Sequence, residues 1–67
     1  MNEVQPMPST RISEGRYAVL GTSTECIVER HATTAWTRWH LYVGGAFHRH
    51  FRTKRRALQY CQEHPEL

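Results

Sequence analysis

The chain has 67 residues, which is enough for one domain, and its 39% hydrophobic residues include two Trp, three Tyr and two Phe. This composition excludes a disordered chain, and the lack of any run near 18 apolar residues excludes a membrane-spanning helix. The formal net charge of +3 is unremarkable by itself. Met1–Thr10 has no apolar core of a secretory signal, and two widely spaced cysteines, Cys26 and Cys61, form no disulfide framework. We therefore expect a cytoplasmic protein with both thiols buried and free.

The first fourteen residues contain Pro, Ser and Thr but few apolar side chains, so residues 1–14 are predicted to be a flexible tail before a single domain at 15–67. The domain begins with runs of strand-forming residues separated by turn signals. The predicted strands are Arg16–Leu20, Glu25–His31, Trp36–Val43 and Ala46–Arg52. In the second of these, Cys26, Val28 and Arg30 alternate with Glu25, Ile27 and Glu29.

The glycine pair between the last two strands leaves two possible registers. A two-residue loop, Gly44-Gly45, pairs Tyr42 with Phe47 and mixes apolar and charged residues on one face. A three-residue loop that includes Ala46 pairs Val43 with Phe47, Leu41 with Arg49 and Trp39 with Phe51, and it separates the faces. Because a slip of one residue exchanges the two faces of a strand, we favour the three-residue loop.

A helix follows directly, with Thr53 as its predicted N-cap and Pro65 ending it at or before His64. Its narrow apolar stripe is expected to pack on one face of the sheet and leave the other face open. The predicted core is Trp39, Leu41, Val43, Phe47, Phe51, Ala57, Leu58 and Cys61. The predicted fold class is α+β: a small antiparallel meander of three to four strands with one C-terminal helix packed on one face.

Positive charge is concentrated in the middle of the chain, since no acidic residue lies between Glu29 and Glu63. The face predicted to stay open combines aromatic, basic and histidine side chains, and three cations open the helix although the helix dipole disfavours them there. Such a surface suits nucleic acid, with arginines on phosphates or guanine and aromatic rings on bases. The candidate nucleic-acid-binding residues are Trp36, Arg38, His40, Tyr42, His48, His50, Arg52, Lys54, Arg55 and Arg56.

The segment from Trp36 to Tyr60 resembles the sheet-plus-helix DNA-binding module of tyrosine-recombinase arm-binding domains and the related AP2-type domains. The resemblance is carried by Trp39, the Val43-Gly44-Gly45 hairpin and the run from Phe51 to Leu58, and it covers about 25 residues closely. It implies that the open face enters the major groove of duplex DNA, with Arg52 and Lys54 near phosphates. The chain departs from the family in its fourth strand and in carrying more His than Arg on that face.

Other functions compete for the same residues. Trp, Tyr and Arg are enriched at protein interfaces, so an inhibitor or adaptor docking on an acidic protein partner is the alternative function, and a homodimer through the sheet is possible. His40, His48 and His50 form one potential metal-binding group and Cys61 with His64 another, but the two groups are predicted on opposite sides of the sheet, so no metal or other cofactor is expected. No set of residues resembles a catalytic site, and we expect no enzyme.

Overall fold

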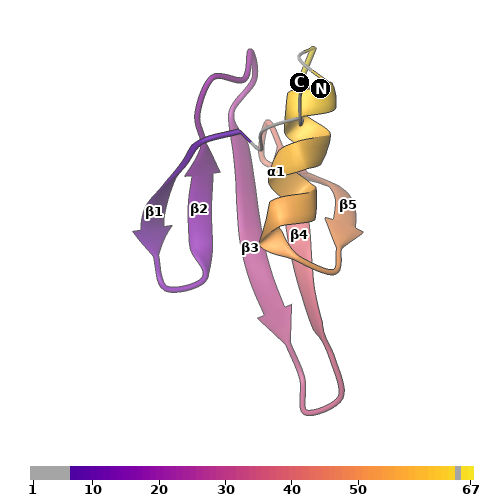
Figure 1. Ribbon diagram of the computed structural model, residues 1–67. Helices are drawn as coiled ribbons and strands as arrows, with labels where there is room; N and C mark the ends of the chain where they lie inside the picture. The colour runs from indigo at the N-terminus through magenta and orange to yellow at the C-terminus, as the bar shows by residue number, and fades with distance from the viewer. Residues whose placement is uncertain (1–6, 65) are drawn as a thin grey trace, which may run out of the picture.

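The computed structural model describes residues 7–64, 66 and 67 of the chain. Within them the chain forms β1 (Ser9–Ser13), β2 (Arg16–Val19), β3 (Cys26–Ala32), β4 (Thr37–Val43), β5 (Ala46–Phe51) and α1 (Lys54–Glu63). The strands pair antiparallel in the order β1-β2-β3-β4-β5, so the sheet is a meander, and the helix crosses one of its faces (Figure 1). The predicted α+β fold is confirmed, with five strands rather than three to four.

The additional strand is β1, in a segment that we had predicted to be a flexible tail. Ser9 pairs with Val19 and Arg11 with Tyr17, so the folded domain begins well before residue 15. Alternation of apolar residues gives no sign of this strand, because its side chains are mostly exposed and it is held by backbone pairing to β2. Residues 1–6 of the predicted tail lie outside the described residues.

The β4–β5 hairpin has the two-residue loop, so the predicted three-residue loop is wrong. Gly44 and Gly45 have φ values of +60° and +85°, which is the backbone of a turn that glycine adopts readily and that suits the twist of a hairpin. Val43 pairs with Ala46 and Tyr42 with Phe47. A bulge at His48 then shifts the register, so the predicted pairs of Leu41 with Arg49 and Trp39 with Phe51 are confirmed, and only the predicted pair of Val43 with Phe47 is wrong. The turn is therefore tight and the extra residue lies further along β5.

This register moves Phe47 out of the predicted core. Its side chain is 54% exposed and lies on the face that α1 does not cover, opposite Tyr42. Leu41, by contrast, is completely buried. The remaining predicted core is confirmed: Leu41, Ala57, Leu58 and Cys61 are buried, while Trp39, Val43 and Phe51 pack against them partly exposed.

The core is completed by Val19, Cys26 and Val28, which β2 and β3 direct toward the helix. Both Cys26 and Cys61 are buried and free, as predicted. Thr53 is the N-cap of α1, because its hydroxyl accepts a hydrogen bond of 3.1 Å from the backbone N–H of Arg56. Across the described residues, no helix has the length and apolar character needed to span a bilayer.

One hairpin is longer than its neighbours. The β2 pairing with β3 ends at Arg16 and Glu29, and the β5 pairing with β4 ends at Phe51 and Trp39. Beyond these pairs β3 and β4 continue together as a two-stranded ribbon, which projects past the rest of the sheet in Figure 1. We call residues 30–39 the β-ribbon, counting the flanked pair of Arg30 and Trp39 as its base. The first turn of α1 lies at its base.

Candidate nucleic-acid interface

The tip of the β-ribbon is a short loop, residues 33–36, that its own hydrogen bonds hold in place. The Thr33 backbone N–H donates to the Trp36 carbonyl over 2.8 Å. The Thr33 hydroxyl accepts from the backbone N–H groups of Ala35 and Trp36, at 3.1 and 3.2 Å. A threonine in this position is typical of a turn that mimics backbone pairing with its side chain. These bonds fix the backbone that carries Trp36.

Trp36 and Arg38 form a pair on the side of the β-ribbon facing away from α1. The guanidinium carbon of Arg38 lies 5.2 Å from the centre of the Trp36 ring, and the indole is 44% exposed. A guanidinium stacked on an aromatic ring keeps its N–H edge available for other partners. One of the Arg38 N–H groups donates a hydrogen bond of 3.0 Å to the Thr37 carbonyl. The pair thus offers a rigid aromatic surface and further free donors.

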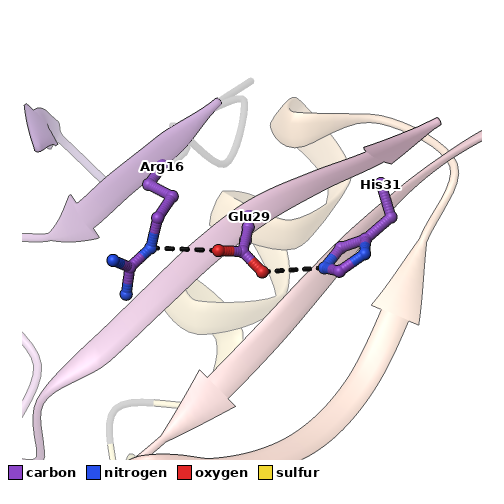
Figure 2. A network of polar contacts seen from close by, with 3 residues as sticks. All are labelled: Arg16, Glu29 and His31. Atoms are coloured by element: carbon purple, nitrogen blue, oxygen red, sulfur yellow. Dashed lines mark hydrogen bonds and ion pairs between the residues drawn. The ribbon is translucent and has the colours of Figure 1, made fainter. Parts of the chain in front are cut away.

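At the base of the β-ribbon, Glu29 is held between two cationic or potentially cationic side chains (Figure 2). Arg16 Nε lies 3.0 Å from Glu29 Oε2, and His31 Nε2 lies 2.8 Å from Glu29 Oε1. Glu29 was not among the predicted site residues. These contacts offset its negative charge, so this carboxylate at the base of the β-ribbon repels an approaching anion less than a free carboxylate does.

The His31 ring stacks on His40, with 3.9 Å between centroids and an interplanar angle of 19°. His40 pairs across the sheet with Glu29 on one side and with His50 on the other. Burial lowers the pKa of His40 below its ordinary value of 6.5; positive charge on His31 or His50 lowers the pKa further, while Glu29 raises it. His40 therefore favours its neutral form in the folded protein.

Nearer the Gly44-Gly45 turn, the open face is apolar. Ile27, Tyr42 and Phe47 form one row across three strands. The Tyr42 and Phe47 rings meet edge to face with centroids 6.0 Å apart, and His40 makes a similar contact with Phe47 at 5.1 Å. The open face is thus divided into a polar region by the β-ribbon and an apolar row by the turn.

The cations around the start of α1 do not form a continuation of the open face. Arg52 and Arg55 are exposed where β5 joins the helix. Lys54 lies on the helix-covered side, with its ammonium nitrogen 3.6 Å from the centre of the Tyr17 ring. Arg56 lines a groove between β5 and α1. The first turn of α1 is therefore basic on several sides at once.

His48 was predicted on the open face, and this prediction is wrong. Its Nε2 atom is 3.0 Å from the hydroxyl of Tyr60 on α1, so the side chain lies on the helix side of β5. The bulge explains the reversal, because an inserted residue interrupts the alternation of side chains along a strand. Of the predicted open-face set, Arg38, His40, Tyr42 and His50 share that face through their pairings, and Trp36 lies with Arg38.

The potential metal ligands do not come together in the part of the chain that the structure describes, where no group of three His, Cys, Asp or Glu side chains could hold a metal ion. His48 lies apart from His40 and His50 on the other side of β5. Cys61 is buried, whereas His64 contacts Glu66 at 3.2 Å.

Sequence reasoning missed Arg30 and His31 in the β-ribbon and Arg49 in the groove. The alternation in β3 already placed His31 with Ile27 and Glu29, and could have assigned it to the open face. The favoured register already paired Leu41 with Arg49, and the structure confirms this pair, but Arg49 was not named among the candidate binding residues. Comparison of the chain with protein-family models, curated proteins and solved structures gives no match.

Proposed function

We propose that this protein binds duplex DNA by inserting the β-ribbon into the major groove. The observation that carries the proposal is the projection of β3 and β4 beyond both flanking strands, with Trp36 and Arg38 at the projecting end. The major groove accepts a two-stranded ribbon, and an arginine is the side chain that most often recognises guanine there. The resemblance to sheet-plus-helix DNA-binding modules supports the same function.

The dimensions favour the β-ribbon over the whole open face. Five strands about 4.8 Å apart make a sheet roughly 19 Å wide between its outer strands, whereas the major groove is about 12 Å wide and 8.5 Å deep. Beyond the Trp39–Phe51 pair, the paired residues His31 and Ala32 extend roughly 7 Å at strand geometry, before the loop adds its own length. In this arrangement His40, Tyr42 and His50 stay above the bases.

Phosphate contacts fall to the cations at the base of the β-ribbon. Arg52 and Arg55 are exposed beside it, and Lys54 follows the N-cap of α1. A DNA strand bordering the groove passes this position when the ribbon enters. Contacts of this kind orient a protein on DNA without reading sequence. They also supply a reason for cations at a helix start, where the dipole alone disfavours them.

Salt dependence tests the proposal. Binding of a fluorescent duplex, followed by anisotropy, is expected to weaken steeply with sodium chloride, with a log–log slope of about −0.9 for each phosphate neutralised. Replacing both Arg52 and Arg55 with Gln is expected to make the slope less negative by roughly 1.8, if each arginine contacts one phosphate. Failure to bind any duplex at low salt overturns the proposal.

A second candidate function is protein binding through the apolar row Ile27, Tyr42 and Phe47. The exposure of Phe47, at 54%, favours it, because large apolar side chains left open often mark interfaces. An acidic partner would add contacts to nearby cations, and a second copy of the chain is the other occupant. Sedimentation of the wild type and of Phe47→Asp tests self-association: a dimer that the substitution dissociates supports the homodimer, and a monomer in both excludes it.

A further inference from the structure

The β5–α1 edge contains a groove of about 310 Å³ on the side of the sheet opposite the open face. Its lining consists of Arg49, Phe51, Arg56, Gln59, Tyr60 and Glu63. Two guanidinium groups and one carboxylate give this small surface a net positive charge. Among the described residues, neither Arg49 nor Arg56 forms an ion pair with a carboxylate.

Arg49 is held in position rather than left free. Its guanidinium carbon lies 5.3 Å from the Phe51 ring centre and 5.0 Å from the Tyr60 ring centre. Tyr60 is itself positioned by the 3.0 Å hydrogen bond between its hydroxyl and His48 Nε2. The bulge in β5 makes both contacts possible, since it places His48 and Arg49 on the helix side together. A guanidinium fixed in this way loses less entropy when it binds an anion.

We propose that this groove binds a phosphate group, with Arg49 and Arg56 as its ligands. Guanidinium N–H groups match phosphate oxygens in geometry, and two of them within one groove neutralise a dianion. Gln59 contributes a further amide donor from the next turn of α1. Glu63 lies at the same groove and favours a ligand that also carries a donor or positive charge near its phosphate.

The phosphate can belong to bound DNA or to a free phosphate ester. Binding of the group itself is independent of the β-ribbon, because the groove lies on the other side of the sheet from Arg38. Pyrophosphate is therefore a suitable probe, since it supplies the phosphate chemistry without any nucleic acid.

The experiment is a titration of the 15N-labelled protein with pyrophosphate at low ionic strength, with sodium chloride at matched ionic strength as control. We expect saturable shifts of the Gln59 and Tyr60 amides that chloride does not reproduce. Arg49→Gln and Arg56→Gln are each expected to weaken binding about tenfold, as loss of a charge-assisted hydrogen bond does, while Arg11→Gln on β1 leaves it unchanged. Shifts that do not saturate, that chloride reproduces, or that persist in both variants overturn the proposal.

A second arm identifies the source of the phosphate. If Arg49→Gln makes the log–log salt slope of duplex binding less negative by about 0.9, the groove holds a phosphate of the DNA. If the slope is unchanged while pyrophosphate binding is weakened, the ligand is a free phosphate ester. Loss of DNA binding in a β-ribbon variant that still binds pyrophosphate separates this site from the proposed DNA interface.

Discussion

Arg38 and Trp36 lie stacked at the projecting end of the β3–β4 hairpin, with the guanidinium carbon 5.2 Å from the indole centre. The pair lies beyond the last residues that β2 and β5 reach, so little of the protein surrounds it. An aromatic ring under a guanidinium orients its donors and leaves them facing outward. This relationship, rather than the total charge of the chain, is what the proposed DNA binding rests on.

Removing either member of the pair is expected to weaken duplex binding without unfolding the protein. Arg38→Gln removes a guanidinium that can contact guanine, and a loss of affinity of about fivefold to 150-fold is expected, about 1–3 kcal/mol. Trp36→Ala removes the ring that orients Arg38, with a smaller loss in the same direction. Fluorescence anisotropy measures both, and circular dichroism checks the fold.

Arg11→Gln is the matched control, because it removes the same charge from the exposed edge strand β1. Its affinity is expected to stay within about twofold to threefold of wild type, since it loses only long-range attraction. Equal losses in Arg11→Gln and Arg38→Gln would show that net charge, and not the β-ribbon, governs binding.

The hairpin register predicts opposite stability effects for two large side chains. Leu41 is completely buried, and Leu41→Ala is expected to lower the free energy of unfolding by about 2–5 kcal/mol. Phe47 is 54% exposed, so Phe47→Ala is expected to cost much less, about 1 kcal/mol. Urea unfolding compares them. If Phe47→Ala lowered the free energy of unfolding as much as Leu41→Ala does, the result would contradict the two-residue turn and support the three-residue loop.

The neutral form favoured at His40 makes stability depend on pH. Because the pKa of His40 is lowered below 6.5 in the folded state, the unfolded chain takes up a proton first as the pH falls. The free energy of unfolding is therefore expected to decrease as the pH drops from about 6.5 through the lower folded pKa. Urea titrations between pH 7.5 and 5 measure this, a window in which His31, His50 and Glu29 also act on His40.

The substitution His40→Gln is expected to flatten that pH dependence, while His64→Gln, at the end of α1, is expected to keep it. An identical pH dependence in wild type and His40→Gln would contradict the lowered pKa.

Burial, together with the nearby Cys26 thiol, raises the pKa of Cys61 to about 11 from an ordinary value of 9.0. At pH 8 the folded protein therefore has about 100-fold less Cys61 thiolate than an unfolded chain. Iodoacetamide labelling followed by mass spectrometry is expected to modify Cys61 at least that much more slowly in the native protein than in guanidinium chloride. Comparable rates in the two conditions would show that this part of the core is open to solvent.

The sequence was sufficient for β2 to β5, for α1 with its Thr53 cap, and for the open face, because apolar alternation and turn residues mark these elements. It was insufficient for β1, whose exposed side chains carry no periodic signal. It also failed at Phe47 and His48, since a tight Gly-Gly turn followed by a bulge has the same composition as a longer loop. A bulge depends on how two strands pair, and the sequence of either strand alone does not determine that pairing.

The candidate interface was predicted in part. Arg38 was predicted on the open face of a strand, and it lies there, whereas Trp36 was predicted on the same strand but lies in the loop just before β4. The β-ribbon was not predicted, because its length depends on where β2 and β5 stop pairing. These ends are set by the turn at Gly15 and by the start of the helix after Thr53. The neutralising contacts of Glu29 with Arg16 and His31 could not be predicted, because they depend on three positions meeting on one face of the folded sheet.

The most direct measurement is a map of amide shifts in the 15N-labelled protein when a short duplex is added at low salt. Insertion of the β-ribbon predicts that the largest shifts fall within residues 30–39 and around Arg52 and Arg55, and that Arg38→Gln reduces them. Shifts centred instead on Ile27, Tyr42 and Phe47, or no shifts at all with any duplex, would contradict DNA binding through the β-ribbon.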